Sequence, residues 1–247
     1  MQADRGGYEL VRIPGGKFVM GSTEAEQERW AAGDKDYRKY FADESPQHEV
    51  ELAEFCLGMH PVTNDEYGRY LEANPGTQEP KHWSDRKYNQ SKQPVVGVSW
   101  EEANAYCKWA GLVLPTEAQW EYACRAGTTT AFWSGDGEED LARVGWYHGN
   151  SEGRLHPVGE KPANPFGLHD MHGNVLEWCR DWFGSYEEDP ARGPEGEREV
   201  KGSGYRVLRG GSFGDVARRA RSAYRYYQHP SYRAHNLGFR AARAPTP

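Results

Sequence analysis

The sequence is poor in cysteine, and its last part has none. Of 247 residues only four are cysteines, and none follows Cys179. The spacings between Cys56, Cys107, Cys124 and Cys179 match no CxxC pair, so no zinc-ribbon or thioredoxin-type motif is present. We therefore expect four buried thiols that pack as small apolar side chains.

Long apolar runs are also missing. No stretch approaches the roughly 20 apolar residues that a membrane-spanning helix needs. The N-terminus, MQADRGGYEL, has no hydrophobic signal region. We therefore expect a soluble, cytoplasmic chain without membrane insertion. A net charge of −7 opposes attraction of the whole protein to nucleic acid, which makes a nucleic-acid partner the weakest binding hypothesis.

Three helices are predicted at capping boxes, in which a Ser or Thr side chain and a Glu or Gln three residues later satisfy each other's backbone amides. The boxes begin at Thr63, Ser99 and Thr116, and the helices are expected over 62–74, 99–110 and 116–125. Gly111 is the predicted stop of the second helix, because glycine readily adopts the left-handed conformation that ends a helix.

The remaining elements are expected to be short. Residues 8–22 predict two strands joined as a hairpin, 47–59 one strand, and 95–99 another. Residues 128–165 are predicted to be loop with short strands, because Gly and Pro punctuate them. Apolar segments are interleaved along the whole chain without a linker, so we expect one domain over 1–247.

The C-terminal arm, residues 206–240, stands apart from the rest. It opens with RVLRGGS and closes with NLGFR, and between them it is dense in Arg, Tyr and His with few aliphatic side chains. Such a run has no continuous apolar face for a buried strand, yet it is too aromatic for a disordered tail. We predict an ordered, exposed surface that is anchored at both ends.

Four motifs occur in the order of one known family. Residues 95–125, 167–178, RVLRGGS and NLGFR together resemble the formylglycine-generating-enzyme (sulfatase-modifying factor) family. The resemblance extends from Pro14 to Arg240. It implies an irregular, loop-rich α+β fold related to C-type lectins, with few short helices and short antiparallel strands.

The resemblance also implies a test for catalysis. The family's founding enzyme oxidises a substrate cysteine with a copper ion held by two cysteines shortly after the RGGS turn. Here the corresponding residues 213–222 read FGDVARRARS. Because a soft sulfur pair selects Cu(I), we expect neither copper nor catalytic residues there. The alternative is a family oxidoreductase or accessory enzyme that uses an unrecognised site.

We predict instead that the arm binds a protein or another macromolecular ligand, because tyrosines give rigid contact area at small entropic cost. The arm also resembles variable proteins of diversity-generating retroelements, which carry diversified positions between RVLRGGS and GFR. The predicted ligand-binding residues are Phe213, Gly214, Asp215, Val216, Tyr224, Tyr226, Tyr227, His229, Ser231, Tyr232, Ala234 and His235. Arg218, Arg221 and Arg240 are expected to lock the arm onto acidic loops.

A second constellation is DMHGNVLE, residues 170–177. The resemblance implies a structural Ca²⁺ here, held by the Asp170 side chain, the Gly173 and Val175 carbonyls and the Glu177 carboxylate. Hard oxygen ligands from a tight turn suit this ion. The other interpretation, equally open, is a turn whose carboxylates bond backbone amides and arginines.

Overall fold

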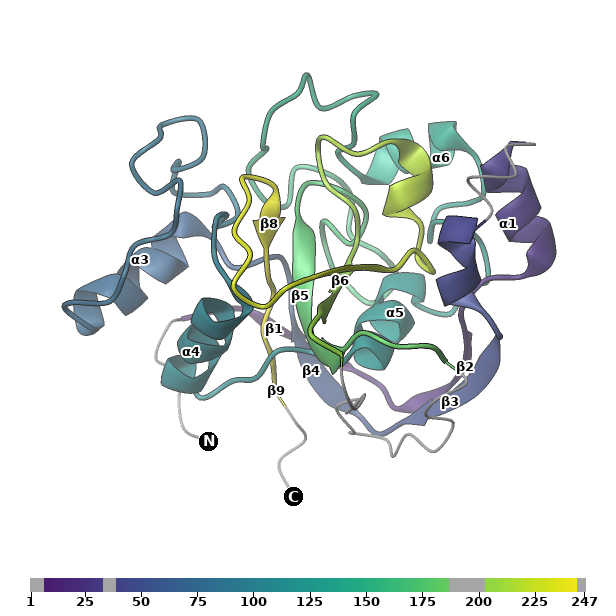
Figure 1. Ribbon diagram of the computed structural model, residues 1–247, viewed down its shortest axis with the longest axis horizontal. Helices are drawn as coiled ribbons and strands as arrows, with labels where there is room; N and C mark the ends of the chain where they lie inside the picture. Colours follow the sequence, from purple (N-terminus) through teal and green to yellow (C-terminus); the bar gives the residue numbers. More distant parts are fainter. Residues whose placement is uncertain (1–6, 33–38, 187–202, 244–247) are drawn as a thin grey trace.

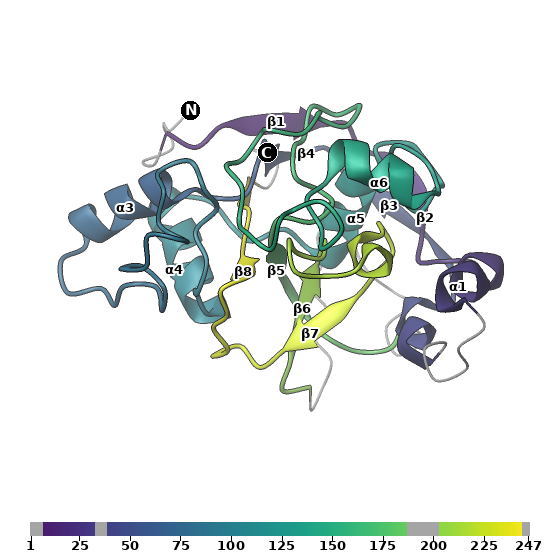
Figure 2. The same ribbon diagram turned by 90° about the horizontal axis from the view of Figure 1, so that it is seen from above.

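The computed structural model describes residues 7–32, 39–186 and 203–243. Short helices and three small sheets are joined by long irregular segments (Figures 1 and 2). This is the loop-rich α+β architecture that the sequence predicts. Within these ranges every helix is too short or too polar to cross a bilayer.

The largest sheet has the strand order β7-β6-β5-β8 and positions the candidate site. β5 (Leu176–Trp182) pairs antiparallel with β6 (Arg206–Arg209) and parallel with β8 (Leu237–Gly238). β7 (Tyr226–Gln228) pairs antiparallel with β6 and lies at the edge. Three of the four strands therefore come from the arm, and the strands at its two ends are buried, as the sequence predicts.

The three capped helices are confirmed. They are α3 (Asn64–Ala73), α4 (Trp100–Ala110) and α5 (Glu117–Arg125), and each has both reciprocal bonds of its capping box. Gly111 ends α4 at a φ of 76°, a value that suits glycine. α5 packs against β5 and β6, which places its acidic residues beneath the arm.

The predicted N-terminal hairpin is wrong, although both of its strands exist. β1 (Leu10–Ile13) pairs with β4 (Phe55–Gly58), and β2 (Gly16–Met20) pairs with β3 (His48–Leu52). β9 (Ala242–Arg243) adds to β4 as the third strand of its sheet.

One close approach between two segments explains why residues 8–22 form no hairpin. It also explains why the single strand predicted over 47–59 is divided into β3 and β4. The Gly15 backbone lies very close to residues 52–54, the segment between β3 and β4. A Cβ at Gly15 would be 2.9 Å from the Leu52 carbonyl oxygen and from the Glu54 amide nitrogen. At this point β1 is followed by β2 and β3 by β4, so the antiparallel pairing passes from the β2–β3 sheet to the sheet that contains β1 and β4. Apolar periodicity predicts strands, but it does not choose their partners.

Two further segments differ from expectation. α6 (Glu138–Val144) lies where loops with short strands were predicted. The acidic segment after β2 contains α1 (Glu24–Ala31) and a 3₁₀ turn, η1 (Lys39–Glu44). The strand predicted over 95–99 is absent. Its backbone instead bonds to separate segments, with the Val95 N–H donating to Val62 and the Gly97 N–H donating to Ala234.

The core is strongly aromatic. Tyr67 of α3 stacks on Tyr106 of α4 with ring centroids 5.5 Å apart, and Phe239 packs edge-on against both rings. Of the four cysteines, only Cys56 is partly exposed, so three of the four predicted buried thiols are confirmed as buried.

Candidate ligand-binding site

Arginines hold the arm to the body of the protein through buried ion pairs. Arg225 donates to both oxygens of Glu117 on α5 at 2.5 and 2.9 Å, and Arg209 of β6 pairs with Glu121 one turn later. Arg221 donates to Glu44 at 2.6 and 3.0 Å. Because a buried charge is stable only when it is paired and hydrogen-bonded, these contacts fix the path of the arm.

This pattern agrees with the predicted role of Arg221 and Arg240. Arg221 also reaches Glu26 at 2.8 Å, and Arg240 makes a bidentate pair with Glu177 at 2.6 and 2.7 Å. Arg218 contributes its carbonyl, which accepts a bond from Arg221 at 3.0 Å. The positive charge of the arm therefore serves largely to anchor it.

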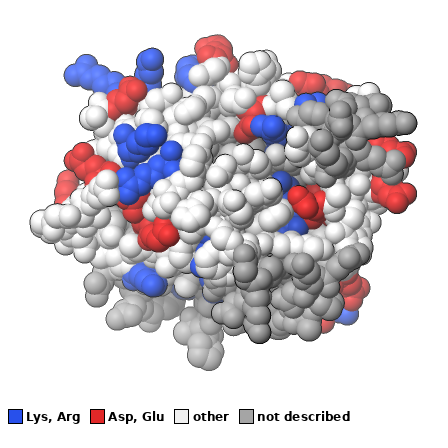
Figure 3. All heavy atoms as spheres, viewed as in Figure 1, with Lys and Arg blue, Asp and Glu red and all other residues white. Residues whose placement is uncertain are grey.

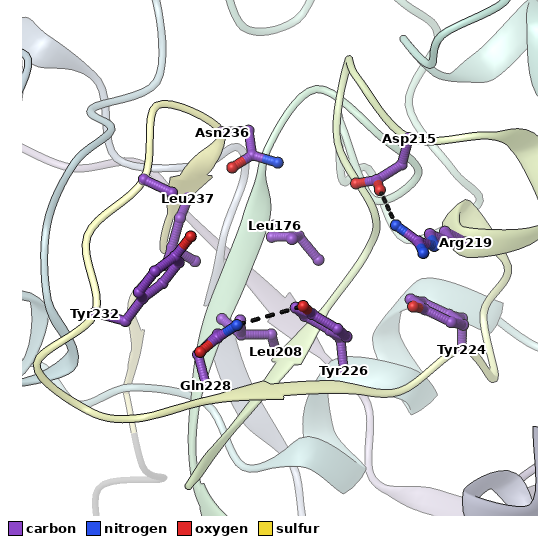
Figure 4. Close-up of a pocket in the computed structure, with 11 residues that line it drawn as sticks. Leu176, Leu208, Asp215, Arg219, Tyr224, Tyr226, Gln228, Tyr232, Asn236 and Leu237 are labelled. Atoms are coloured by element: carbon purple, nitrogen blue, oxygen red, sulfur yellow. Dashed lines mark hydrogen bonds and ion pairs between the residues drawn. The ribbon is translucent and has the colours of Figure 1, made fainter. Parts of the chain in front are cut away.

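A pocket of about 110 Å³ opens between the middle of the arm and the four-stranded sheet. Its floor is apolar, made by Leu176 of β5 and Leu208 of β6 (Figure 4). Tyr232 and Leu237 face Tyr224 across this floor. Tyr232 is 45% exposed, so its ring forms part of the rim.

One side of the pocket is polar. Asp215 accepts from the Ser212 hydroxyl at 2.5 Å and from Arg219 at 3.0 Å, and the Asn236 amide donates to the Ser212 oxygen at 3.0 Å. These linked bonds orient Asp215 and Asn236 toward the pocket before any ligand arrives. Burial raises the pKa of the Tyr224 phenol above its ordinary value.

The predicted ligand-binding residues fall into three groups. Seven are exposed: Gly214, Val216, Tyr227, His229, Ser231, Tyr232 and His235. Asp215, Tyr226 and Ala234 are half-buried, and Phe213 and Tyr224 are buried. Five of the twelve line the pocket: Asp215, Tyr224, Tyr226, Tyr232 and Ala234.

Phe213 differs most from the expectation of an exposed anchor. It is only 4% exposed and packs in an apolar cluster with Val96, Leu155 and Val175. A side chain this enclosed supports the surface from below and does not reach a ligand.

The predicted set of ligand-binding residues left out six of the eleven residues that line the pocket. The additional residues are Leu176, Leu208, Arg219, Gln228, Asn236 and Leu237. Only the four-residue spacing of Asp215 and Arg219 gave a local signal, since oppositely charged residues at this spacing pair in a helical turn. The leucines are brought in by sheet pairing, which the sequence pattern does not specify.

The predicted calcium turn is already rich in hydrogen bonds. Both oxygens of Glu177 accept from Arg240, and one also accepts from the Trp120 indole at 2.7 Å. One oxygen of Asp170 accepts from the Gly159 N–H at 2.8 Å, and the other has a 3.4 Å contact with Asn174. An ion at this turn would share Glu177 with Arg240, so the calcium site at Asp170, Gly173, Val175 and Glu177 stays a prediction.

A buried thiol lies beside a histidine, which raises the question of a nucleophile. The sulfur of Cys124 is 3.7 Å from Nε2 of His172 and 3.6 Å from the Ser222 hydroxyl. Burial raises the pKa of the thiol to about 12 and lowers the pKa of His172 to about 4. Both ring nitrogens of His172 already bond the backbone, Nδ1 to the Ala220 carbonyl at 2.7 Å and Nε2 to the Trp133 N–H at 3.1 Å, so the ring helps to hold these segments together.

Comparison with known proteins places these features in a family. Residues 2–245 match the family described as "Sulfatase-modifying factor enzyme 1-like domain". The chain is 35% identical over 253 residues to "Serine/threonine-protein kinase pkn1" of Chlamydia caviae, covering 95% of this chain and 38% of that protein. It is 31% identical to "Formylglycine-generating enzyme" of Streptomyces coelicolor, covering 94% and 88%. The chain thus spans less than half the length of its chlamydial relatives.

Two solved structures are similar over nearly the whole chain. PvdO from Pseudomonas aeruginosa superimposes with a TM-score of 0.82 at 30% identity, covering 96% of this chain and 94% of that one. "Treponema denticola variable protein 1" gives a TM-score of 0.77 at 24% identity, covering 96% and 95%. The second likeness shows a shared fold.

Proposed function

The chain belongs to the sulfatase-modifying factor enzyme 1-like family, and we propose that it is a binding protein that presents its C-terminal arm to a protein ligand. The observation that carries this proposal is the tyrosine-lined pocket with an apolar floor and a hydrogen-bonded polar side. Such concave sites, with a few oriented polar groups, are typical ligand sites.

Preorganisation supports this function. The arm is fixed from below by the buried pairs of Arg209, Arg221 and Arg225, so little chain entropy is lost when a ligand binds. Above them, Tyr224, Tyr226 and Tyr232 line the pocket with large side chains that have few rotatable bonds. Binding energy at protein interfaces concentrates on such aromatic side chains in pockets.

The chemistry of the pocket lining favours binding over catalysis. Among the described residues that line it there is no Cys, His or Lys. Asp215, the only carboxylate there, is held by Ser212 and Arg219. The stretch 213–222, where the family enzyme has its copper-binding cysteines, has none.

The alternative is an oxidoreductase or accessory enzyme, since a relative with 31% identity is named formylglycine-generating enzyme. Incubation of the purified protein with copper, oxygen and a cysteine-containing sulfatase peptide tests this alternative. Formation of an aldehyde with turnover would overturn the binding proposal.

The arm is further proposed to be a diversified segment. The motif order RVLRGGS and NLGFR carries this idea, and seven of the twelve proposed positions are exposed. A variable protein shares the fold, which is compatible with the proposal. A template repeat and a reverse-transcriptase gene beside the coding sequence would support it, and their absence from the complete genome would end it.

Binding itself is tested by selecting a displayed random dodecapeptide library on the immobilised chain. We expect Ala234→Trp, which fills the pocket, to lower the affinity of selected peptides by about tenfold or more, as expected for loss of a central anchor. The matched control is Val19→Trp, at a residue that is 50% exposed and outside the arm. Equal binding by both variants, each with an unchanged melting temperature, would contradict a role for the pocket.

A further inference from the structure

Most arginine side chains of the arm interact with carboxylates or aromatic rings of the same chain. In addition to the four buried arginines, Arg219 pairs with Asp215 at 3.0 Å, and Arg233 pairs with Glu102 at 2.5 Å. Arg206 is held between the rings of Trp100 and Trp182, 3.8 and 3.6 Å from their centroids. The most basic stretch of the sequence is therefore not the most available source of positive charge.

Available cations lie instead on residues 81–92, a part of the segment that joins α3 to α4, here called the basic loop. Its four exposed cations are Lys81, Arg86, Lys87 and Lys92. Its only acid is Asp85, whose carboxylate accepts from the Lys87 backbone N–H at 3.0 Å. Within the described part of the chain these four side chains form no ion pair. Figure 3 shows several Lys and Arg side chains at the upper left of the face, with Asp and Glu among them, while the middle of the face is largely uncharged.

The basic loop is held in one conformation. The Asn64 amide donates to the carbonyls of Tyr88 and Gln90 at 2.9 and 3.0 Å, and the Gln93 amide donates to Lys87 at 3.2 Å. The Lys81 N–H donates to Gly97 at 2.9 Å. These bonds at both ends and in the middle preorganise the charges for recognition.

The loop also contacts the arm directly. The ring of Tyr88 lies 5.7 Å from that of His235, and the ring of His82 lies 6.1 Å from it. His235 is next to Ala234 and Asn236, which both line the pocket. The basic loop thus meets the arm beside two residues of the pocket lining.

We infer that the basic loop is the second half of the binding surface and that it selects protein segments with Asp or Glu beside the side chain that enters the pocket. This inference rests on the proposed binding function. The whole chain has a net charge of −7 although the basic loop itself is positive, so an acidic segment is repelled elsewhere and guided to this loop. A nucleic acid would require many phosphate contacts, and the arm's arginines do not supply them.

The test compares two variants of equal charge in the peptide selection. The loop variant carries Lys81→Gln, Arg86→Gln, Lys87→Gln and Lys92→Gln. The control variant neutralises four exposed cations elsewhere: Arg12→Gln, Lys108→Gln, Arg143→Gln and Arg154→Gln. We expect peptides enriched on the natural chain to contain an excess of Asp and Glu. We expect this excess on the control variant and not on the loop variant.

Affinities of the enriched peptides give a second readout. Raising the salt from about 50 to about 300 mM should weaken binding to the natural chain several-fold and binding to the loop variant much less. Enriched peptides without acidic bias would overturn the inference and leave the proposed function standing. Failure to enrich any peptide would end both. Tighter binding of a single-stranded oligonucleotide or of phosphatidylserine vesicles than of acidic peptides would also overturn it.

Discussion

The two sides of the arm use different chemistry. Below, Arg209, Arg221 and Arg225 are completely or almost completely buried and meet carboxylates at hydrogen-bond distance. Above, Tyr226 lines the pocket, and Tyr232 at its rim is 45% exposed. One segment therefore divides its work between arginines that anchor it and tyrosines that remain available for contact. Because anchoring does not depend on the upper side chains, these positions can change without loss of the fold.

The largest loss of stability is expected when a buried arginine of the arm is replaced. Arg221→Met leaves Glu44 buried without its guanidinium partner, and we expect it to lower the free energy of unfolding by about 3–5 kcal/mol. Arg219→Met is the control, because this arginine is 43% exposed and its pair should contribute about 0–1 kcal/mol. Urea unfolding measures both. Similar small losses in the two variants would show that the buried pair is not an anchor.

A second pair of variants distinguishes a residue that stabilises the fold from a residue that contacts the ligand. Phe213→Ala should cost about 3–5 kcal/mol of stability, because the ring is buried in an apolar cluster. Tyr232→Ala should cost less than about 0.5 kcal/mol of stability and yet weaken a selected peptide about tenfold. Unfolding and binding are measured on the same preparations. Loss of affinity in a fully folded Phe213→Ala protein would restore Phe213 as a contact residue.

The buried His172 predicts a pH dependence of stability. Its Nδ1 donates to the Ala220 carbonyl at 2.7 Å, and its Nε2 accepts from the Trp133 N–H at 3.1 Å, so the folded state requires the neutral ring. Burial lowers its pKa to about 4, from an ordinary value near 6.5. The unfolded chain therefore takes up this proton first, and stability should fall as the pH drops from about 6.5 to about 4, by about 3 kcal/mol in total.

This pH dependence is measured by urea unfolding at several pH values. His172→Gln should flatten the slope between these limits. His229→Gln, at an exposed ring, is the control and should leave the slope unchanged. An equal slope in the natural chain and the His172→Gln variant would refute this account.

The elements that the sequence predicts well are those determined by short local motifs. Thr63, Ser99 and Thr116 each cap a helix through bonds to residues within one turn, so a short motif contains all the information. The partners of β1 and β2 lie 28 to 48 residues away and are set by packing. The same holds for the pocket. Its tyrosines could be predicted from composition, but Leu176 reaches the floor only because β5 pairs with β6.

The smallest predicted effect concerns the turn where the arm's last arginine meets the body of the protein. If Ca²⁺ binds at Asp170 and Glu177 as we propose, Ca²⁺ at about ten times its Kd should stabilise the fold by about 1.4 kcal/mol. The melting temperature should then rise by about 3–6 °C relative to EDTA. Asp170→Asn should abolish this response, and Mg²⁺ should not reproduce it. Equal melting temperatures in Ca²⁺ and EDTA would contradict the calcium site. The turn would then be stabilised by Arg240, which donates to both oxygens of Glu177. In that case, the arm is anchored at this end as it is in the middle, by a guanidinium without a metal ion.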